Sequence, residues 1–476
     1  MGLPQLTVLN EAEIQALHRT ALRLLAEVGM SVPTREAQAL LKRAGARVET
    51  SDRVYLPREL VSEALEAAPK QFQLRDRRGG TLPLPTDSHY HISGAATLQV
   101  LDYGSCVPRQ PTLDDLIRFT RLANVLPLIS CIAPQVTQLR AEGTNSTRQM
   151  LLYVLRDMLC NTTKHCIFAP PTLQWGEIWL EMGEILAGTR SLASNPVISV
   201  EVAPNTPLQW DKDSLEVLLL TARKGVPILM LPLGLAGMSA PITIAGSLAL
   251  VTAQALCGLV IAVLVNPEVP VIWGALGNEI LDMRVADLAL AGPEDALGMV
   301  AGAQMARFYG LPSISCAPHS DAKLPDVQVG MEKMANMLST IAAGVDMSIN
   351  AGSLNKSSVS SFEQLIIDHE MLRYVHRYLK GVTVTEKTLA YEVIEEVGPG
   401  GNFLSAEHTM NFLHSGENVY LRVFDRTGIN VEVPDLLSRA HEEVEATLAR
   451  HEPAVPEETI TQLTAYANKA RHQIPG

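Results

Sequence analysis

Titratable side chains gather in one short polar stretch of the sequence, HSDAK, which contains His319, Asp321 and Lys323. This stretch follows a short apolar run, Ser313 to Ala317, and precedes a helical pattern that leads to a second apolar run. In parallel α/β folds, the loops after the C-terminal ends of strands build the active site. The local pattern therefore nominates His319, Asp321 and Lys323 as residues that carry chemistry.

Each of these three residues has a functional and a structural interpretation. Asp321 could be the counterion of a bound cation, because a carboxylate about 5 Å from a quaternary nitrogen contributes roughly 3 kcal/mol at an effective dielectric constant of about 20. It could instead cap the helix that starts near Asp326, or pair with Lys323. His319 could hydrogen-bond a substrate carboxylate or orient Asp321. Lys323 could bind a substrate carboxylate or lie solvated at the surface.

Further candidates lie at or near the ends of other apolar runs. Glu201 falls inside the run SVEVAPN, where a carboxylate is either functional or part of a structural salt bridge. Asn205 and Asn350 end two runs, and a carboxamide there could bind a substrate carboxylate. Phe168 and Trp273 also lie at the ends of runs, where an aromatic face suits a trimethylammonium group or simply packs the core.

The cysteines do not form a metal-binding pattern. Six are scattered through the chain with no CxxC pair. The spacing of Cys316 and His319 would suit two zinc ligands, but two more ligands are needed and no matching cluster is evident. We therefore expect reduced thiols and no metal site.

Composition narrows the class of protein. The chain has 476 residues and a formal charge of −13, which argues against nucleic acid and anionic membranes as partners. It is 47% hydrophobic but only 5% aromatic, which favours an Ala/Leu/Val-rich α/β protein. No signal-peptide pattern is visible, so a cytoplasmic location is expected. The run Ile242 to Val265 is long enough to span a bilayer, but polar residues interrupt it, and a buried helix is the favoured interpretation.

Eight short apolar runs alternate with helical patterns in the middle of the chain. These candidate strands are Tyr90–Ser93, Leu128–Pro134, His165–Ala169, Val197–Ala203, Pro227–Leu233, Val271–Ala275, Ser313–Ala317 and Asp346–Asn350. Eight β/α units predict a (β/α)8 barrel. The alternative, a doubly wound open sheet, usually carries a Gly-rich phosphate loop, and none is evident. We expect a helical N-terminal subdomain over residues 1–85, the barrel over 86–360, and a helical C-terminal extension packed on it over 361–476.

Several segments carry a family resemblance in the same order along the chain. They are LLAEVGMSVP, YLPRELVSEALEAAP, GLAGMSAPITIAGSLAL, HSDAKLPDVQVGMEK, INAG and EVGPGGNFLSAEHT. Together they resemble the trimethylamine methyltransferase family of corrinoid-dependent methyltransferases over nearly the whole chain. The resemblance implies a (β/α)8 barrel that moves a methyl group from an amine to the Co(I) corrinoid of a small partner protein.

One departure from that family bears on the substrate. Its trimethylamine enzymes carry pyrrolysine, whereas this chain contains only standard residues. The chain therefore resembles the pyrrolysine-free branch, which implies a small quaternary amine such as glycine betaine as the methyl donor. A corrinoid carried by a partner protein is the implied cofactor, with none bound permanently. The loop of Gly234, Gly237 and Met238 could contact it, although turn geometry alone explains the glycines.

Other functions remain open from the sequence. A barrel lyase or aldolase could use Lys323 as a Schiff-base nucleophile, and a non-catalytic scaffold could hold a corrinoid protein. We also expect a homo-oligomer. Proline betaine, carnitine and other quaternary amines are alternatives to glycine betaine that the motifs do not separate.

Overall fold

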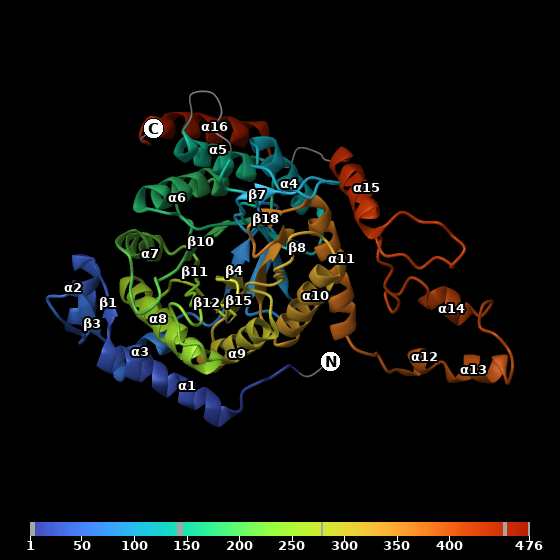
Figure 1. The fold of residues 1–476 in the computed structure, drawn as a ribbon, viewed down its shortest axis with the longest axis horizontal. Coiled ribbons are helices and arrows are strands. Elements are labelled where there is room, and N and C mark those ends of the chain that lie inside the picture. The colour runs from blue at the N-terminus through green and yellow to red at the C-terminus, as the bar shows by residue number, and fades with distance from the viewer. Residues whose placement is uncertain (1–4, 140–145, 278, 451–454, 475–476) are drawn as a thin grey trace.

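Eight parallel strands close into a barrel at the centre of the molecule (Figure 1). The structure is a computed structural model that describes residues 5–139, 146–277, 279–450 and 455–474. The barrel strands are β6 (Tyr90–Ser93), β8 (Ile129–Ile132), β9 (His165–Phe168), β10 (Ile198–Val202), β11 (Ile228–Met230), β12 (Val271–Gly274), β15 (Ser313–Ser315) and β16 (Met347–Ala351). All eight predicted strands are present, so the predicted (β/α)8 barrel is confirmed.

A helix follows each barrel strand and packs outside it. In chain order these helices are α4 (Leu113–Val125), α5 (Thr147–Cys160), α6 (Leu173–Ala187), α7 (Lys212–Lys224), α8 (Ile244–Val265), α9 (Pro293–Tyr309), α10 (Val327–Ala342) and α11 (Phe362–Leu379). Short strands decorate the loops at the C-terminal ends of the barrel strands: β7 (Gln99–Val100), β13 (Ile280–Asp282), β14 (Asp287–Ala289), β17 (Ser353–Leu354) and β18 (Val359–Ser360). The eighth helix, α11, lies beyond residue 360, so the repeating units extend past the predicted boundary of the barrel.

The barrel interior is closed at its N-terminal end by a hairpin. Strands β4 (Phe72–Arg75) and β5 (Thr81–Leu84) pair in antiparallel fashion. Leu74 and Leu84 of this hairpin belong to the same buried cluster as the inward-facing residues of the barrel. The backbone N–H of Arg75 donates to the carbonyl of Pro196, just before β10. The hairpin therefore plugs the end of the barrel from which the strands start.

The N-terminal segment covers one side of the barrel. It contains α1 (Glu11–Arg23), a π-helical turn (Leu24–Val28), α2 (Arg35–Arg43) and α3 (Arg58–Ala67), together with a small sheet of β1 (Met30–Ser31), β2 (Arg47–Val48) and β3 (Arg53–Tyr55). Asn10 and Glu13 form the capping box that starts α1. The segment is thus more than the helical subdomain predicted, because it also contributes this sheet and the plugging hairpin.

Helix α8 is the long apolar run of the sequence, and it is long and apolar enough to cross a membrane by composition alone. Most of it is buried, because α1, α2 and α3 cover its outer side while α7 and α9 flank it. A helix covered on every side needs no polar face. The interpretation as a buried helix is therefore confirmed.

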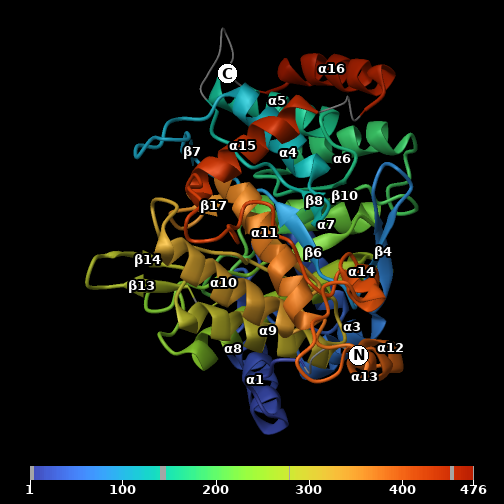
Figure 2. The same cartoon turned by 90° about the vertical axis from the view of Figure 1, so that its right-hand side faces the viewer.

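The C-terminal part returns to the barrel twice. Helices α15 (Leu436–Ala449) and α16 (Glu457–Arg471) pack on α11 and α4 and on α5 and α6, respectively. Between α11 and α15, the chain projects away from the body and carries three short helices, α12 (Glu386–Leu389), α13 (Tyr391–Val397) and α14 (Glu407–Phe412) (Figures 1 and 2). This part of the chain is helical, as expected, but much of it does not pack on the barrel.

Candidate active site

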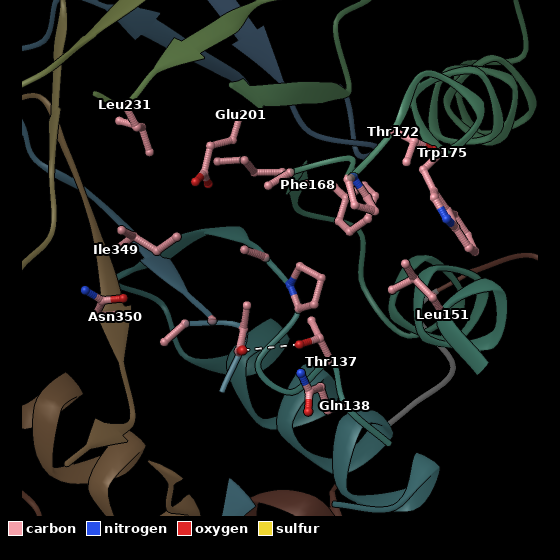
Figure 3. A pocket seen from close by; sticks show the side chains of 18 of the residues that line it. Thr137, Gln138, Leu151, Phe168, Thr172, Trp175, Glu201, Leu231, Ile349 and Asn350 are labelled. Carbon is pink, nitrogen blue, oxygen red and sulfur yellow. Dashed lines mark hydrogen bonds between the residues drawn. The ribbon is translucent and has the colours of Figure 1, made fainter. Parts of the chain in front are cut away.

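A cavity of about 720 Å³ lies at the C-terminal ends of the barrel strands (Figure 3). Residues at or just beyond the ends of β6, β8, β9, β10, β11, β15 and β16 line it, and α5 and α6 supply one side. The volume falls in the range of about 300–1,000 Å³ that suits small-molecule ligands. The cavity therefore occupies the place where barrel enzymes carry out their chemistry.

Glu201 is the carboxylate of this cavity. On β10 it is registered against Leu229, whose side chain faces the barrel interior, while Val200 and Val202 pack in the outer layer. Alternation along a strand therefore points Glu201 inward, and Figure 3 shows its carboxylate facing the cavity. No hydrogen bond or ion pair joins it to another side chain within the described residues. Burial raises the pKa of Glu201 to about 7.

Aromatic and aliphatic side chains form much of the remaining wall. Phe168 ends β9, lines the cavity and packs against Trp179 with ring centroids 5.5 Å apart. Trp175, in the first turn of α6, also lines the cavity, together with Leu151 from α5 (Figure 3). Phe168, a candidate from the sequence, therefore lies in the lining of the cavity. Trp175 was not among the candidates from the sequence, so its place in the wall of the cavity was missed.

Polar groups near the outer part of the cavity complete the lining. Gln138 and Thr137 follow β8, Thr172 precedes α6, and Asn350 lies in β16 (Figure 3). The Thr137 hydroxyl donates to the carbonyl of Ala96 at 3.2 Å. Arg148 of α5 also lines the cavity. The cavity thus combines one carboxylate, one guanidinium group, aromatic faces and neutral amide groups.

Asn350 links the cavity to His319. The Nε2 atom of His319 lies 2.5 Å from Nδ2 of Asn350, while its Nδ1 atom lies 3.1 Å from the carbonyl oxygen of Leu290. His319 is buried and does not itself line the cavity. When the ring is neutral with its proton on Nδ1, Nε2 can accept a hydrogen bond from the Asn350 amide. His319 is therefore placed to orient Asn350 rather than to touch a ligand.

Asp295 holds the other side of the His319 ring. Its Oδ2 atom lies 3.4 Å from Nδ1 of His319, and both side chains are buried. Burial favours the neutral imidazole, but the hydrogen bond and charge of Asp295, the charge of Glu279 and the carbonyl of Leu290 together outweigh burial and raise the pKa of His319. Burial also raises the pKa of Asp295 and brings that of nearby Glu279 to about 7. This cluster lies beside the cavity, and its only side chain in the lining is that of Asn350.

A buried ion pair fixes the strand end that carries Asn350. Asn350 has a φ of 104°, a conformation that L-residues rarely adopt, at a register shift in β16. Two residues on, the N–H of Gly352 donates to Asp368 at 2.7 Å. Lys333 donates to the same carboxylate oxygen at 2.6 Å, and both charged side chains are fully buried. The pair of Lys333 and Asp368 therefore ties α10 and α11 to the loop that positions Asn350.

Asp321 and Lys323 lie outside the lining of the cavity. Asp321 is half-buried, and its Oδ1 accepts the N–H of Leu290 at 2.9 Å. The side chain that caps α10 is Asp326 rather than Asp321. Lys323 is exposed. The loop is where the sequence placed it, but it holds the edge of the site through backbone contacts instead of presenting these two side chains to the cavity.

Two further expectations need correction. Trp273 points outward and packs against Tyr309 with ring centroids 4.9 Å apart, because its position on β12 falls on the helix-facing side. Asn205 is exposed, and its backbone carbonyl accepts a hydrogen bond from Gln254. Neither residue lines the cavity. The loop of Gly234, Gly237 and Met238 lies after β11, with Met238 exposed, and is outside the lining, so its expected contact with the corrinoid stays a prediction.

In the ranges that the structure describes, no three His, Cys, Asp or Glu side chains come together as a set that could hold a metal ion. All six cysteines are free thiols. Cys316 lines the cavity, and burial raises the pKa of its thiol, so it is present there as a neutral group. The charged side chains that line the cavity are therefore Glu201 and Arg148, with Asn350 and other neutral polar, apolar and aromatic neighbours.

Comparisons with known proteins agree with this architecture. Residues 1–475 match the sequence model of the family described as trimethylamine methyltransferase (MTTB). A glycine betaine methyltransferase of Desulfitobacterium hafniense (strain Y51) is 31% identical over 473 residues, which cover 98% of this chain and 97% of that protein. The trimethylamine methyltransferase MttB of Methanosarcina barkeri is 29% identical and covers 94% of this chain and 92% of its own length.

A solved structure shows the same fold. The crystal structure of the Methanosarcina barkeri monomethylamine methyltransferase (MtmB) superimposes with a TM-score of 0.50 at 12% identity, over 99% of this chain and 95% of that one. At this identity the similarity concerns the fold alone. The family match extends over nearly every residue, and the resemblance seen in the sequence motifs is confirmed. The chain belongs to the trimethylamine methyltransferase family.

Proposed function

We propose that this protein transfers a methyl group from a small quaternary amine, with glycine betaine as the donor, to the Co(I) corrinoid of a partner protein. The observation that carries the proposal is Glu201, a carboxylate without a partner among the described residues, facing a cavity with aromatic walls. The glycine betaine methyltransferase among the relatives supports the choice of donor. In this proposal the protein acts in the cytoplasm.

A quaternary ammonium group has no N–H to donate. It is therefore bound by charge, by aromatic faces and by contact with its methyl groups. Glu201 supplies the charge, while Phe168 and Trp175 supply aromatic surface in the same cavity. A bound cation would stabilise the ionised form of Glu201, whose pKa burial otherwise raises to about 7. These groups suit a permanent cation better than a neutral ligand.

The polar groups of the lining suit the other end of a betaine. The side-chain amides of Gln138 and Asn350 and the hydroxyl of Thr172 line the same cavity. Each can donate a hydrogen bond to a carboxylate, and the guanidinium of Arg148 in the same lining can do so with a positive charge. A zwitterion with its ammonium group at Glu201 and its carboxylate toward these donors would use both parts of the lining.

The leaving group explains why so few titratable residues line the cavity. When the bond between the methyl carbon and nitrogen breaks, its electron pair stays on nitrogen and the amine leaves as a neutral molecule, so no proton is needed. The corrinoid, when its carrier protein is docked, supplies the nucleophile that takes the methyl group. The task of the chain is then to hold the methyl group toward the mouth and to exclude water. The mainly apolar lining of the cavity suits that task.

The two alternative functions gain no support from the geometry. Lys323 is exposed and outside the cavity lining, so it is not placed to form a Schiff base with a ligand held there. A scaffold without catalysis would have no use for a carboxylate turned into an enclosed cavity. We therefore keep methyl transfer as the single proposal.

Stopped-flow spectroscopy of a cognate corrinoid protein, held as Co(I), tests the proposal. Glycine betaine should convert the Co(I) spectrum to that of methyl-Co(III) only when this chain is present. Dimethylglycine, which lacks one methyl group, should react far more slowly. Its nitrogen carries a proton in place of the fourth alkyl group, and that proton does not activate the remaining methyl groups for transfer as the fourth alkyl group does. Demethylation of glycine betaine by the chain without any corrinoid, or equal transfer rates for the two amines, would contradict the proposal.

A further inference from the structure

Residues 382–416, which we call the arm, project from the body of the molecule between α11 and α15 (Figure 1). None of its three helices, α12, α13 and α14, has a buried residue. Apart from the N–H of Glu417, which donates to the Ser415 hydroxyl at the end of the arm, every hydrogen bond described for the arm stays within it. The arm is therefore attached to its own chain only at its two ends.

The arm nevertheless has the composition of a packed element. Its large apolar side chains are exposed, and they are Val382, Val384, Leu389, Tyr391, Ile394, Phe403, Leu404, Met410 and Leu413. Leu404 is 83% exposed and Tyr391 is 71% exposed. Isolated helices shorter than about 12 residues are marginal in water, and most helical stability comes from packing of an apolar face. Helices of 4, 7 and 6 residues therefore need a surface that this chain does not provide.

The exposed apolar area is close to what a stable interface needs. These side chains present on the order of 700 Å² of apolar surface, judged from their exposed fractions and a typical area for a large side chain. A standard protein interface buries about 800 Å² on each partner, and monomeric proteins rarely expose apolar patches much above about 600 Å². The arm thus exposes about as much apolar area as one side of a stable interface buries.

The position of the arm argues against a partner protein that docks transiently over the cavity as the molecule that covers the arm. Barrel helices run antiparallel to the strands, so α11 ends at the N-terminal end of the barrel, where His376 lies near His89 just before β6. The arm leaves from there, whereas the cavity opens at the opposite end. A partner that docks over the cavity would leave the arm exposed. A partner that comes and goes would expose it again in each cycle.

We infer that the arm binds a second copy of this chain, with the two copies exchanging arms about a two-fold axis. A second copy is present from synthesis onward at matching concentration, and symmetric self-association is the commonest use of such surfaces. Apolar character over a whole interface is also more typical of homodimers than of transient complexes. Tyr374 and Tyr378, exposed one turn apart on α11 beside the root of the arm, continue the apolar surface onto the body and form part of the receiving surface.

Measurement of the mass in solution by light scattering tests this inference without any activity readout. The full chain should have at least twice the monomer mass of 51.6 kDa at micromolar concentration. The double variant Tyr391→Glu/Leu404→Glu should shift to the monomer mass with an unchanged circular dichroism spectrum. Val107→Glu, at an exposed valine in the loop between β7 and α4, is the matched control and should keep the mass of the unmodified chain.

A monomeric unmodified chain, or a double variant that keeps the mass of the oligomer, would overturn the inference. A second measurement on the unmodified chain covers the case in which the variant does not fold. Copies labelled with ¹⁴N and ¹⁵N are mixed, and a linker with one amine-reactive end and one photoreactive end is attached at lysines. Peptides containing Lys387 of α12 should be joined to peptides of the opposite isotope. Links from Lys387 confined to one isotope in an oligomer would exclude exchange of arms.

Discussion

Replacement of Glu201 by glutamine tests the centre of the proposed site. The substitution keeps the shape of the side chain and removes its charge. At an effective dielectric constant of about 20 and a separation of about 5 Å from a quaternary nitrogen, the lost attraction is about 3 kcal/mol, or roughly a hundredfold in affinity. Isothermal titration of glycine betaine into the folded variant measures this loss. Because Glu201 has no side-chain partner within the described residues, no other interaction of the native protein is broken.

The pH dependence adds a second signature of the same residue. Burial raises the pKa of Glu201 to about 7 in the free protein, so the carboxylate must lose a proton before it attracts the cation below that pH. Affinity of the unmodified chain should therefore fall about tenfold between pH 8 and pH 6, while that of Glu201→Gln stays flat. The advantage of the unmodified chain over the variant should shrink from roughly a hundredfold at pH 8.5 to about tenfold at pH 6.

Asp321→Asn is the comparison variant, because Asp321 is a half-buried carboxylate outside the cavity lining. Its charge was the counterion favoured by the sequence, whereas the geometry assigns that part to Glu201. We expect its affinity for glycine betaine to change by less than about threefold. A larger loss for Asp321→Asn than for Glu201→Gln, or an unchanged affinity and pH profile for Glu201→Gln, would refute the reasoning.

Three further predictions concern other parts of the molecule. Trp175→Leu should weaken glycine betaine binding by up to about 2 kcal/mol, as measured by calorimetry. Binding of 3,3-dimethylbutanoate, the carbon isostere that keeps the carboxylate but lacks the cationic nitrogen, should be weakened less, and equal losses would argue against an interaction of the cation with the ring. Lys333→Met should lower the free energy of unfolding in urea by about 3–5 kcal/mol, with partial recovery in Lys333→Met/Asp368→Leu, whereas no loss in the single variant would show that the pair is not needed. Burial lowers the pKa of His89 and of His165 to about 4, so the unfolded chain binds more protons and stability should be lost as the pH falls from about 6.5 towards 4, by on the order of 2 kcal/mol for each histidine at pH 5. Thermal unfolding followed across that pH range measures the loss, and a constant midpoint would contradict it.

The sequence predicted the barrel well because its strands are buried on both faces. Such strands appear as short apolar runs regardless of which side each residue faces, so all eight were found. Because both faces of these strands are apolar, however, the sequence does not show which side chains point into the barrel and which point toward the helices. Glu201 and Trp273 both looked like candidates for the site, but β10 turns Glu201 inward while β12 turns Trp273 toward Tyr309. Register in the closed barrel, which decides the facing, is set by all neighbouring strands together.

The parts of the site that were missed depend on long-range contacts. Trp175 and Trp179 share a helix, yet only the first reaches the cavity, because the start of α6 lies at the mouth. Lys333 appeared in the sequence only as the last residue of the segment HSDAKLPDVQVGMEK. Its ion pair was not predicted, since its buried partner Asp368 lies 35 residues away in the chain. The hairpin over the barrel was not predicted either, because its strands have only four residues each and β5 contains a proline, which gives a weak signal.

The hairpin of β4 and β5 also means that the barrel cannot be excised or exchanged as a unit that starts at its first strand. Its leucines complete the innermost layer of the barrel, yet they come from the sequence before the first barrel strand. A fragment that began at β6 would expose that layer to water from below and would lose the floor beneath the cavity. In chimeras with relatives, the hairpin should therefore be exchanged together with the barrel. A crossover placed between Leu84 and Tyr90 would join a floor from one parent to walls from another.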